Sequence, residues 1–322
     1  MTKPDSPTVL LCTDTFVAEH GARLARAAPD VDVVELGDSN DVSEVDRERI
    51  TIAFLSKDTW PERFRPFLDM AQASPRLDWL HVMSAGVEGA VFQAFRDRGV
   101  TVTRTAGASA SAIAETVFMY LHALSRDVRA HNDLYAAREW RWETWRQLEG
   151  RRITVLGYGP IAQRIIHLAL AYDMIPTAVR RTIRGDEMCA TRLLDDLADA
   201  VADADVVVVA LPLNPDTHGL VSRDVIRRCK VGAILVNVSR GLIVAQGALT
   251  DALADGHLGG GGLDVFDPEP LAVDDRLWDL PNVILTPHNS GSSNLGPQKV
   301  ADIFFEHLAL YLDNADFSTL IP

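Results

Sequence analysis

ITVLGYGPIA, residues 153–162, is the stretch that decides the fold of this chain. A short apolar segment is followed directly by a glycine-rich turn. Pro160 comes next, and proline is favoured at the first position of a helix. Gly157 allows the tight turn, Gly159 lets the backbone approach a pyrophosphate, and Ala162 is small enough for close packing. A GxGxxA pattern alone also fits a plain βα turn, but between a strand and a helix it predicts a dinucleotide-binding unit.

The same turn predicts which backbone groups contact the dinucleotide. Free N–H groups at the start of a helix attract phosphates. We therefore expect cofactor contacts from Gly157, Tyr158, Gly159, Pro160 and Ile161.

Strands and helices alternate on both sides of this turn, which predicts an α/β fold with two Rossmann-like, doubly wound parallel sheets. The run Val206–Val209 is apolar throughout, as expected of a central strand covered on both faces. Expected strands lie at Thr8–Thr13, Val31–Leu36, Thr51–Leu55, Leu77–Met83, Val100–Thr103, Ile153–Leu156, Ile175–Val179, Val206–Leu211, Ala233–Val238, Gly259–Val265 and Val283–Thr286. Expected helices lie near 17–28, 61–73, 88–98 and 298–312, with one long and mostly unbroken helix at 109–137.

Length and composition limit the classes of protein that fit. A chain of 322 residues is about right for two domains. The net charge of −14 argues against a nucleic-acid partner. Without an apolar run of about 18 residues, no membrane span is expected. Cys12, Cys189 and Cys229 are far apart and lack metal-ligand spacing, so we expect no metal and a cytoplasmic location.

Three chemically distinctive residues follow three expected strands of the second series. Arg240 ends NVSRG, Glu269 stands between two prolines in GLDVFDPEP, and His288 lies in TPHNSG. A guanidinium suits a carboxylate, and a histidine beside a carboxylate can donate a proton near neutral pH. Each residue alone fits a structural role, but their shared position at strand ends, where ligands bind in α/β sheets, predicts a catalytic group.

Taken together, GYGPIA, NVSRG, GLDVFDPEP and TPHNSG resemble the D-isomer-specific 2-hydroxyacid dehydrogenases, in the same order and spacing. The resemblance implies two α/β domains with a cleft between them. The substrate-binding domain would be discontinuous, formed by residues 1–103 plus 290–322. Residues 104–289 would form the dinucleotide-binding domain.

The resemblance also implies roles for the three residues. Arg240 would orient the 2-keto acid, His288 would give a proton to its carbonyl, and Glu269 would hold the imidazole protonated. The loop VMSAGVE, residues 82–88, looks like the family's substrate loop, although it also fits a simple strand–helix turn. It implies that the backbone N–H groups of Ala85, Gly86 and Val87 grip the substrate carboxylate. Further cofactor contacts are implied for Leu211, Pro212, Thr217, Val238, Ser239 and Asp264, the last with the nicotinamide carboxamide.

The residues after the expected strand 175–179 bear on which cofactor is used. NAD-specific sites carry an acidic residue about 20 positions after the glycines. Here Arg180 and Arg181 stand in that region instead. Guanidinium groups can bind a 2′-phosphate, so we predict NADP(H) in preference to NAD(H), with surface arginines as the plain alternative.

The resulting hypothesis is an NAD(P)-dependent D-2-hydroxyacid dehydrogenase that reduces a small 2-keto acid, similar to glyoxylate/hydroxypyruvate reductases. The family resemblance also implies a homodimer, formed through the long helix after Ser109 and the arm that carries Trp140, Trp142 and Trp145. The alternative is a dinucleotide-sensing scaffold, similar to a corepressor, without physiological turnover. Glu269 argues against formate dehydrogenase, in which a glutamine pairs with the histidine.

Overall fold

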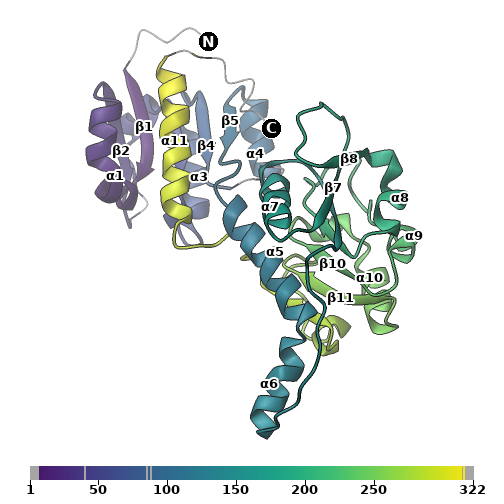
Figure 1. The fold of residues 1–322 in the computed structure, drawn as a ribbon. Coiled ribbons are helices and arrows are strands. Elements are labelled where there is room, and N and C mark those ends of the chain that lie inside the picture. Colours follow the sequence, from purple (N-terminus) through teal and green to yellow (C-terminus); the bar gives the residue numbers. More distant parts are fainter. Residues whose placement is uncertain (1–6, 40, 85, 88, 314, 316–322) are drawn as a thin grey trace. The chain divides into compact units, whose positions relative to one another are not determined.

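A computed structural model describes residues 7–39, 41–84, 86, 87, 89–313 and 315 of the chain. These residues form two compact units (Figure 1). The first contains the residues up to Ala108 together with those from Asn294 onward, and the second is Ser109–Ser293. The divisions lie a few residues from the boundaries expected at 103/104 and 289/290.

The first unit is built on a parallel sheet in the order β2-β1-β3-β4-β5. Its strands are β1 (Thr8–Thr13), β2 (Val31–Leu36), β3 (Ile52–Leu55), β4 (Trp79–Val82) and β5 (Thr101–Arg104). Its helices are α1 (Asp14–Ala27), α2 (Glu44–Arg49), η1 (Lys57–Thr59), α3 (Phe64–Ala73), α4 (Ala90–Asp97) and α11 (Gly296–Leu312).

Helix α11 returns from the end of the chain to complete the core of this first unit. Phe304 of α11 stacks on Phe54 of β3 with 4.1 Å between ring centroids. Trp79 stacks on the same phenylalanine, and Phe16 of α1 meets it edge-on. Aromatic pairs of this kind contribute beyond simple area burial. The two distant segments of sequence therefore form one hydrophobic core, with α11 (yellow) lying beside the sheet in Figure 1.

The second unit is built on a longer parallel sheet in the order β12-β11-β10-β9-β6-β7-β8. Its strands are β6 (Arg152–Leu156), β7 (Ile175–Arg180), β8 (Ala190–Leu193), β9 (Val206–Val209), β10 (Ala233–Asn237), β11 (Leu258–Leu263) and β12 (Val283–Leu285). Its helices are α5 (Ala110–Ser125), α6 (Val128–Ala137), α7 (Pro160–Ala171), η2 (Leu194–Asp196), α8 (Leu197–Ala202), α9 (Arg223–Arg228), η3 (Gly241–Ile243), α10 (Gln246–Ala254) and η4 (Arg276–Asp279). The order reverses between β6 and β9, which is the switch point where α/β sheets bind ligands.

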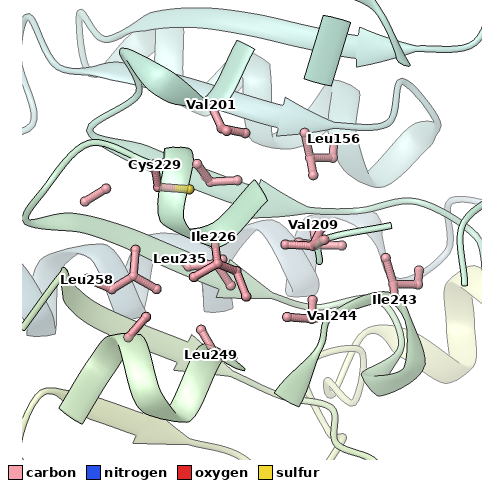
Figure 2. Packing of buried hydrophobic residues seen from close by; sticks show 14 of the residues in the cluster. Leu156, Val201, Val209, Ile226, Cys229, Leu235, Ile243, Val244, Leu249 and Leu258 are labelled. Atoms are coloured by element: carbon pink, nitrogen blue, oxygen red, sulfur yellow. The ribbon is translucent and has the colours of Figure 1, made fainter. Parts of the chain in front are cut away.

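Strand β9 lies in the middle of this sheet and is buried along its whole length, as its apolar run predicts. Val209 packs with Leu235 and Leu249 on one face of the sheet, as Figure 2 shows. Val206 and Val208 pack on the other face, in the cluster that contains residues of α5 and α7. Such burial on both faces explains why β9 carries no polar residue.

The structure differs from the sequence expectation at two places in this unit. The expected unbroken helix at 109–137 is wrong, because α5 and α6 are separate. Asp127 adopts a left-handed conformation with φ +46° between them, and its side chain accepts a hydrogen bond from Ala130 N. Strand β8 was not expected, because this edge strand is mostly exposed and has no apolar run.

Apolar residues of α5 are buried within the chain itself. Val117, Tyr120 and Leu121 are fully buried, in contact with α7 and the sheet. Their apolar character therefore does not require a second copy of the chain. Exposed aromatic residues on and after α6, which extends away from the sheet in Figure 1, include Tyr135, Trp140 and Trp142.

Candidate active site

The glycine-rich turn has the geometry that the sequence predicts. Gly157 has φ +117°, and a Cβ there would lie 2.6 Å from the carbonyl oxygen of Ala210, so only glycine fits. A Cβ at Gly159 would meet no atom within 4 Å, so this side of the turn is open. Helix α7 begins at Pro160, and Ala162 is fully buried against the sheet. An open turn before a helix N-terminus fits the pyrophosphate of a dinucleotide.

Two loops at the neighbouring strand ends are joined by hydrogen bonds. The Ser239 hydroxyl donates to the Leu211 carbonyl, which links the loops after β10 and β9. Thr217 is buried, and its hydroxyl donates to the Pro212 carbonyl at 2.7 Å. Of these predicted cofactor residues, Ser239 and Thr217 therefore use their hydroxyls to brace the loops, and Val238 is buried beside them.

His288 and Glu269 form a close pair. The Nδ1 atom of His288 lies 2.7 Å from Oε2 of Glu269, and the two side chains are 47% and 36% exposed. The other carboxylate oxygen, Oε1, accepts a hydrogen bond from Phe266 N at 3.0 Å. The carboxylate is therefore anchored to its own loop and orients an imidazole that remains accessible to solvent.

Asp264 holds the turn that carries His288. Its buried carboxylate accepts hydrogen bonds from the Thr286 hydroxyl at 2.5 Å and from the backbone N–H groups of Asn289 at 3.0 Å and Ser290 at 3.1 Å. His288 itself has φ +50°, an uncommon conformation for a residue other than glycine. Its backbone N–H donates to the carbonyl of Asp264 at 2.8 Å. The structure thus directs the Asp264 carboxylate, predicted to contact the cofactor, toward the histidine turn.

Tyr120 and Thr286 belong to this network but were missed from the sequence. The Tyr120 hydroxyl is hydrogen-bonded to the Thr286 hydroxyl, and burial raises the pKa of Tyr120 above its ordinary range. Tyr120 lies on α5, far from TPHNSG in sequence, and its apolar neighbours suggested packing only. Thr286 was expected as a strand residue, and only its place two residues before His288 could have drawn attention to it.

Arg240 follows β10 and is positioned by a close backbone contact. A Cβ at Gly241 would lie 2.0 Å from the carbonyl oxygen of Phe266, so the next residue must be glycine. The Asn237 side-chain amide donates to the Arg240 carbonyl at 3.1 Å, and Nη1 of Arg240 donates to the Ser239 carbonyl at 2.8 Å. Because β10, β11 and β12 are adjacent in the sheet, Arg240, Glu269 and His288 follow three neighbouring strand ends.

The expected substrate loop lies in the first unit, after β4. Ala85 lies outside the described residues. The Ser84 hydroxyl donates to the Gly86 carbonyl at 2.7 Å. Val87 is buried, and its carbonyl accepts two hydrogen bonds of 3.2 Å from the Arg96 guanidinium. The carbonyl groups of this loop are therefore held by side chains of the same unit.

Arg180 and Arg181 occupy the end of β7, next to the glycine turn. The guanidinium of Arg180 lies 4.9 Å from the centre of the Tyr158 ring and 2.6 Å from a Glu187 oxygen. Arg181 is exposed and pairs with Asp216 at 2.5 Å. Both arginines lie at the expected place, and each is paired with an acidic side chain.

The described residues also bear on metal binding and membrane insertion. Within those ranges, no group of three or more His, Cys, Asp or Glu side chains is arranged to hold a metal ion. None of the helices in the described part of the chain has both the length and the apolar character of a membrane span.

The chain is similar to proteins of known family. Residues 118–290 match the family model described as the D-isomer specific 2-hydroxyacid dehydrogenase NAD-binding domain. A relative, glyoxylate/hydroxypyruvate reductase B of Pectobacterium carotovorum, is 34% identical over 68% of this chain and 71% of its own length.

Two solved structures are similar over almost the whole chain. A D-isomer specific 2-hydroxyacid dehydrogenase family protein from Aeromonas salmonicida has 30% identity and a TM-score of 0.78, covering 98% of this chain and 99% of its own. A D-isomer specific 2-hydroxyacid dehydrogenase from Xanthobacter autotrophicus, in complex with NADPH and MES, has 25% identity and a TM-score of 0.77. That similarity covers 97% of this chain and 96% of the other.

Proposed function

Because this chain belongs to the D-isomer-specific 2-hydroxyacid dehydrogenase family, we propose that it reduces a small 2-keto acid to the D-2-hydroxy acid. The substrate we propose is of the glyoxylate or hydroxypyruvate type, as in the Pectobacterium relative. The observation that carries the proposal is the 2.7 Å contact between His288 Nδ1 and Glu269 Oε2. A histidine held by a carboxylate through one nitrogen presents the other nitrogen for proton transfer.

Each of the three residues at the strand ends has its own role in the proposed reaction. Arg240 binds the carboxylate and carbonyl oxygens of the keto acid, because its planar guanidinium can donate two parallel hydrogen bonds. The nicotinamide cofactor, when bound, supplies the hydride. His288 Nε2 gives its proton to the carbonyl oxygen, and Glu269 stabilises the imidazolium before that transfer. The exposure of His288 lets water restore the proton afterwards.

The loop after β4 completes substrate binding in this proposal. Backbone N–H groups of Ala85, Gly86 and Val87 take the substrate carboxylate without a positive side chain. Arg96 supports this role, because its two hydrogen bonds to the Val87 carbonyl hold the peptide that the loop must present. The loop after β4 thus adds backbone donors to the substrate contacts proposed for Arg240.

The cofactor we propose is NADP(H) in preference to NAD(H). The NAD-binding domain model matches the second unit, and the Xanthobacter relative is described with NADPH. At the end of β7, this chain places Arg180 and Arg181, whose guanidinium groups can bind a 2′-phosphate. A carboxylate at the same point would instead repel it.

Absorbance of the reduced cofactor tests the proposal directly. Glyoxylate, hydroxypyruvate and pyruvate are each assayed with NADPH and with NADH. We expect turnover of at least one keto acid, with the larger kcat/KM for NADPH, and a smaller NADPH preference for Arg180→Asp. Cofactor binding without turnover of any keto acid would instead support a dinucleotide-sensing scaffold, and equal kcat/KM for both cofactors would refute the NADPH preference.

The proposal includes a cytoplasmic homodimer. On the arm that follows α6, Trp140 is 101% exposed and Trp142 84%. Large exposed aromatic side chains on one projecting segment mark an interaction surface. We assign that surface to a second copy of the chain, in line with the resemblance to the family.

A further inference from the structure

The Glu187 carboxylate lies in a ring of hydrogen-bond donors at the end of β7. Oε1 accepts from Arg180 Nη1 at 2.6 Å and from Arg184 N at 2.8 Å. Oε2 accepts from Gly185 N at 2.8 Å. The side chain is only 5% exposed, although most of the surrounding loop is exposed. These donors hold the pKa of Glu187 below its ordinary value. A guanidinium together with successive backbone N–H groups is the usual construction of an anion-binding site.

This donor ring is connected to the dinucleotide turn through Tyr158. The Tyr158 hydroxyl oxygen accepts the backbone N–H of Met188 at 2.6 Å, next to Glu187. The face of the same ring lies under the Arg180 guanidinium, 4.9 Å from ring centre to Cζ. Tyr158 itself stands between the two glycines of the turn. The position of Glu187 is thus tied to the residues that we propose to hold the cofactor.

The pairing of Arg180 has a direct consequence for binding. Its side chain is 16% exposed, and its Nη1 already donates to Glu187. Asp186 lies farther from the same nitrogen, at 3.6 Å, and its side chain is 70% exposed. A second anion can use the donors that Glu187 occupies, Arg180 Nη1 and the backbone N–H groups of Arg184 and Gly185, only if the carboxylate leaves them.

We propose that Glu187 is an internal competitor for the 2′-phosphate of NADP(H) and thereby sets the cofactor preference of this protein. The inference rests on the proposed function, which assigns Arg180 to the 2′-phosphate. A phosphate and a carboxylate compete for the same donors, so a 2′-phosphate that binds Arg180 Nη1 and the N–H groups of Arg184 and Gly185 displaces Glu187. NAD(H) carries a hydroxyl at this position and leaves the carboxylate in place. The apparent affinity for the phosphorylated cofactor is then the intrinsic affinity multiplied by the fraction of molecules in which the donors are free.

Binding of the adenosine half tests the inference without turnover. Isothermal titration calorimetry compares 2′,5′-ADP with 5′-AMP on the full chain and on Glu187→Gln. We expect the Kd of 2′,5′-ADP to fall about fivefold or more in the variant, a typical size for coupling between competing groups. The Kd of 5′-AMP should stay within about twofold.

Asp186→Asn is the matched control, because it removes the same charge one residue away, from a 70% exposed carboxylate that lies 3.6 Å from Arg180 Nη1 and not at hydrogen-bond distance. It should change the Kd of 2′,5′-ADP by less than Glu187→Gln does. Thermal unfolding of each variant verifies that it folds, and Glu187→Ala repeats the measurement with a side chain that cannot hydrogen-bond.

The outcomes separate the inference from the proposed function. The wild-type chain could bind 2′,5′-ADP tightly while neither Glu187 variant lowers its Kd. That result would overturn the inference and leave the proposed NADPH preference unaffected. Weaker binding of 5′-AMP by the variants would also overturn it, because Glu187 would then recognise ribose hydroxyls. If Asp186→Asn and Glu187→Gln lowered the Kd of 2′,5′-ADP equally, the effect would come from the loss of any negative charge nearby. That result would also contradict the inference. A wild-type chain that binds neither nucleotide would overturn both proposals.

Discussion

His288 Nδ1 lies 2.7 Å from Glu269 Oε2, across a sequence separation of 19 residues. The other oxygen of that carboxylate accepts a hydrogen bond from the backbone N–H of Phe266. The carboxylate that contacts the imidazole is therefore itself held in place. The Asp264 carboxylate holds the turn that carries His288, because it accepts hydrogen bonds from the backbone N–H groups of Asn289 and Ser290. Two loops from neighbouring strands thus hold one imidazole, a preorganisation that the proposed proton transfer would use.

Replacing His288 with Gln should lower kcat by at least about 10², the usual scale of general acid–base catalysis. The amide fills similar space but cannot transfer the proton. The Kd for NADPH, measured by cofactor fluorescence, should be nearly unchanged. Glu269→Gln, which removes only the charge of the partner, should give a smaller loss; normal turnover by His288→Gln would show that another group is the proton donor.

Replacing Arg240 with Lys should mainly raise the KM for the keto acid, because a point charge cannot reproduce the planar, two-pronged donor. Steady-state kinetics at saturating NADPH measure this effect. Arg96→Lys is a useful comparison, since Arg96 donates to a backbone carbonyl of the substrate loop. An unchanged KM in Arg240→Lys would remove Arg240 from substrate binding.

Replacing Asp264 with Asn tests whether this buried carboxylate serves the turn or the cofactor. The amide offers one acceptor oxygen where the carboxylate accepts from Thr286, Asn289 and Ser290. We expect a loss of about 1–3 kcal/mol in the free energy of unfolding, together with a lower kcat, because buried donors lose their partner. Urea unfolding measures the stability of the variant, and NADPH titration measures its affinity for the cofactor. Unchanged stability with weakened cofactor binding would favour a direct contact of Asp264 with the nicotinamide.

The arm after α6 should be required for dimerisation. Sedimentation at micromolar concentration should give twice the chain mass of 35.3 kDa. A double change of Trp140 and Trp142 to Ser should shift the chain toward the monomer, because exposed aromatic residues dominate the energy of interfaces. The same change at Trp60, which is 64% exposed in the first unit, serves as the control. A wild-type monomer at this concentration would rule out the homodimer.

The stability of the chain should fall as the pH is lowered from 7 to 5. Burial and the neighbouring imidazole of His307 hold the pKa of His81 well below its ordinary value. Its Nδ1 lies 2.7 Å from the Thr103 hydroxyl, and within the described residues its buried Nε2 has no hydrogen-bond partner. Because the folded pKa is depressed, the unfolded chain binds more protons in this window. The free energy of unfolding therefore decreases by up to about 1.4 kcal/mol per pH unit for one such histidine.

His81→Gln should flatten this pH dependence, since its amide keeps a partner for Thr103 and does not titrate. Urea unfolding at pH 7, 6 and 5 measures the slope. Carboxylates such as that of Asp302, whose pKa is lowered by Arg23, titrate below this window. Identical slopes in the two proteins would place the pH dependence elsewhere.

Much of this protein was determined by local pattern. The turn at Gly157, the apolar run of β9 and the order of strands and helices are readable from sequence, because backbone conformation and burial depend on neighbouring residues. Arg240, Glu269 and His288 were identified for the same reason, since each follows a strand that the pattern predicts.

Tertiary structure decided which partner each polar group has. No sequence pattern points to Glu187, yet its carboxylate accepts hydrogen bonds from Arg180, Arg184 and Gly185. The Asp264 carboxylate was expected at the cofactor, yet it holds the turn of His288. A hydrogen bond depends on distances of about 3 Å and on direction, which arise only when the loops pack together. Sequence placed Asp264 at the end of a strand, and only the folded chain determined which atoms its carboxylate contacts.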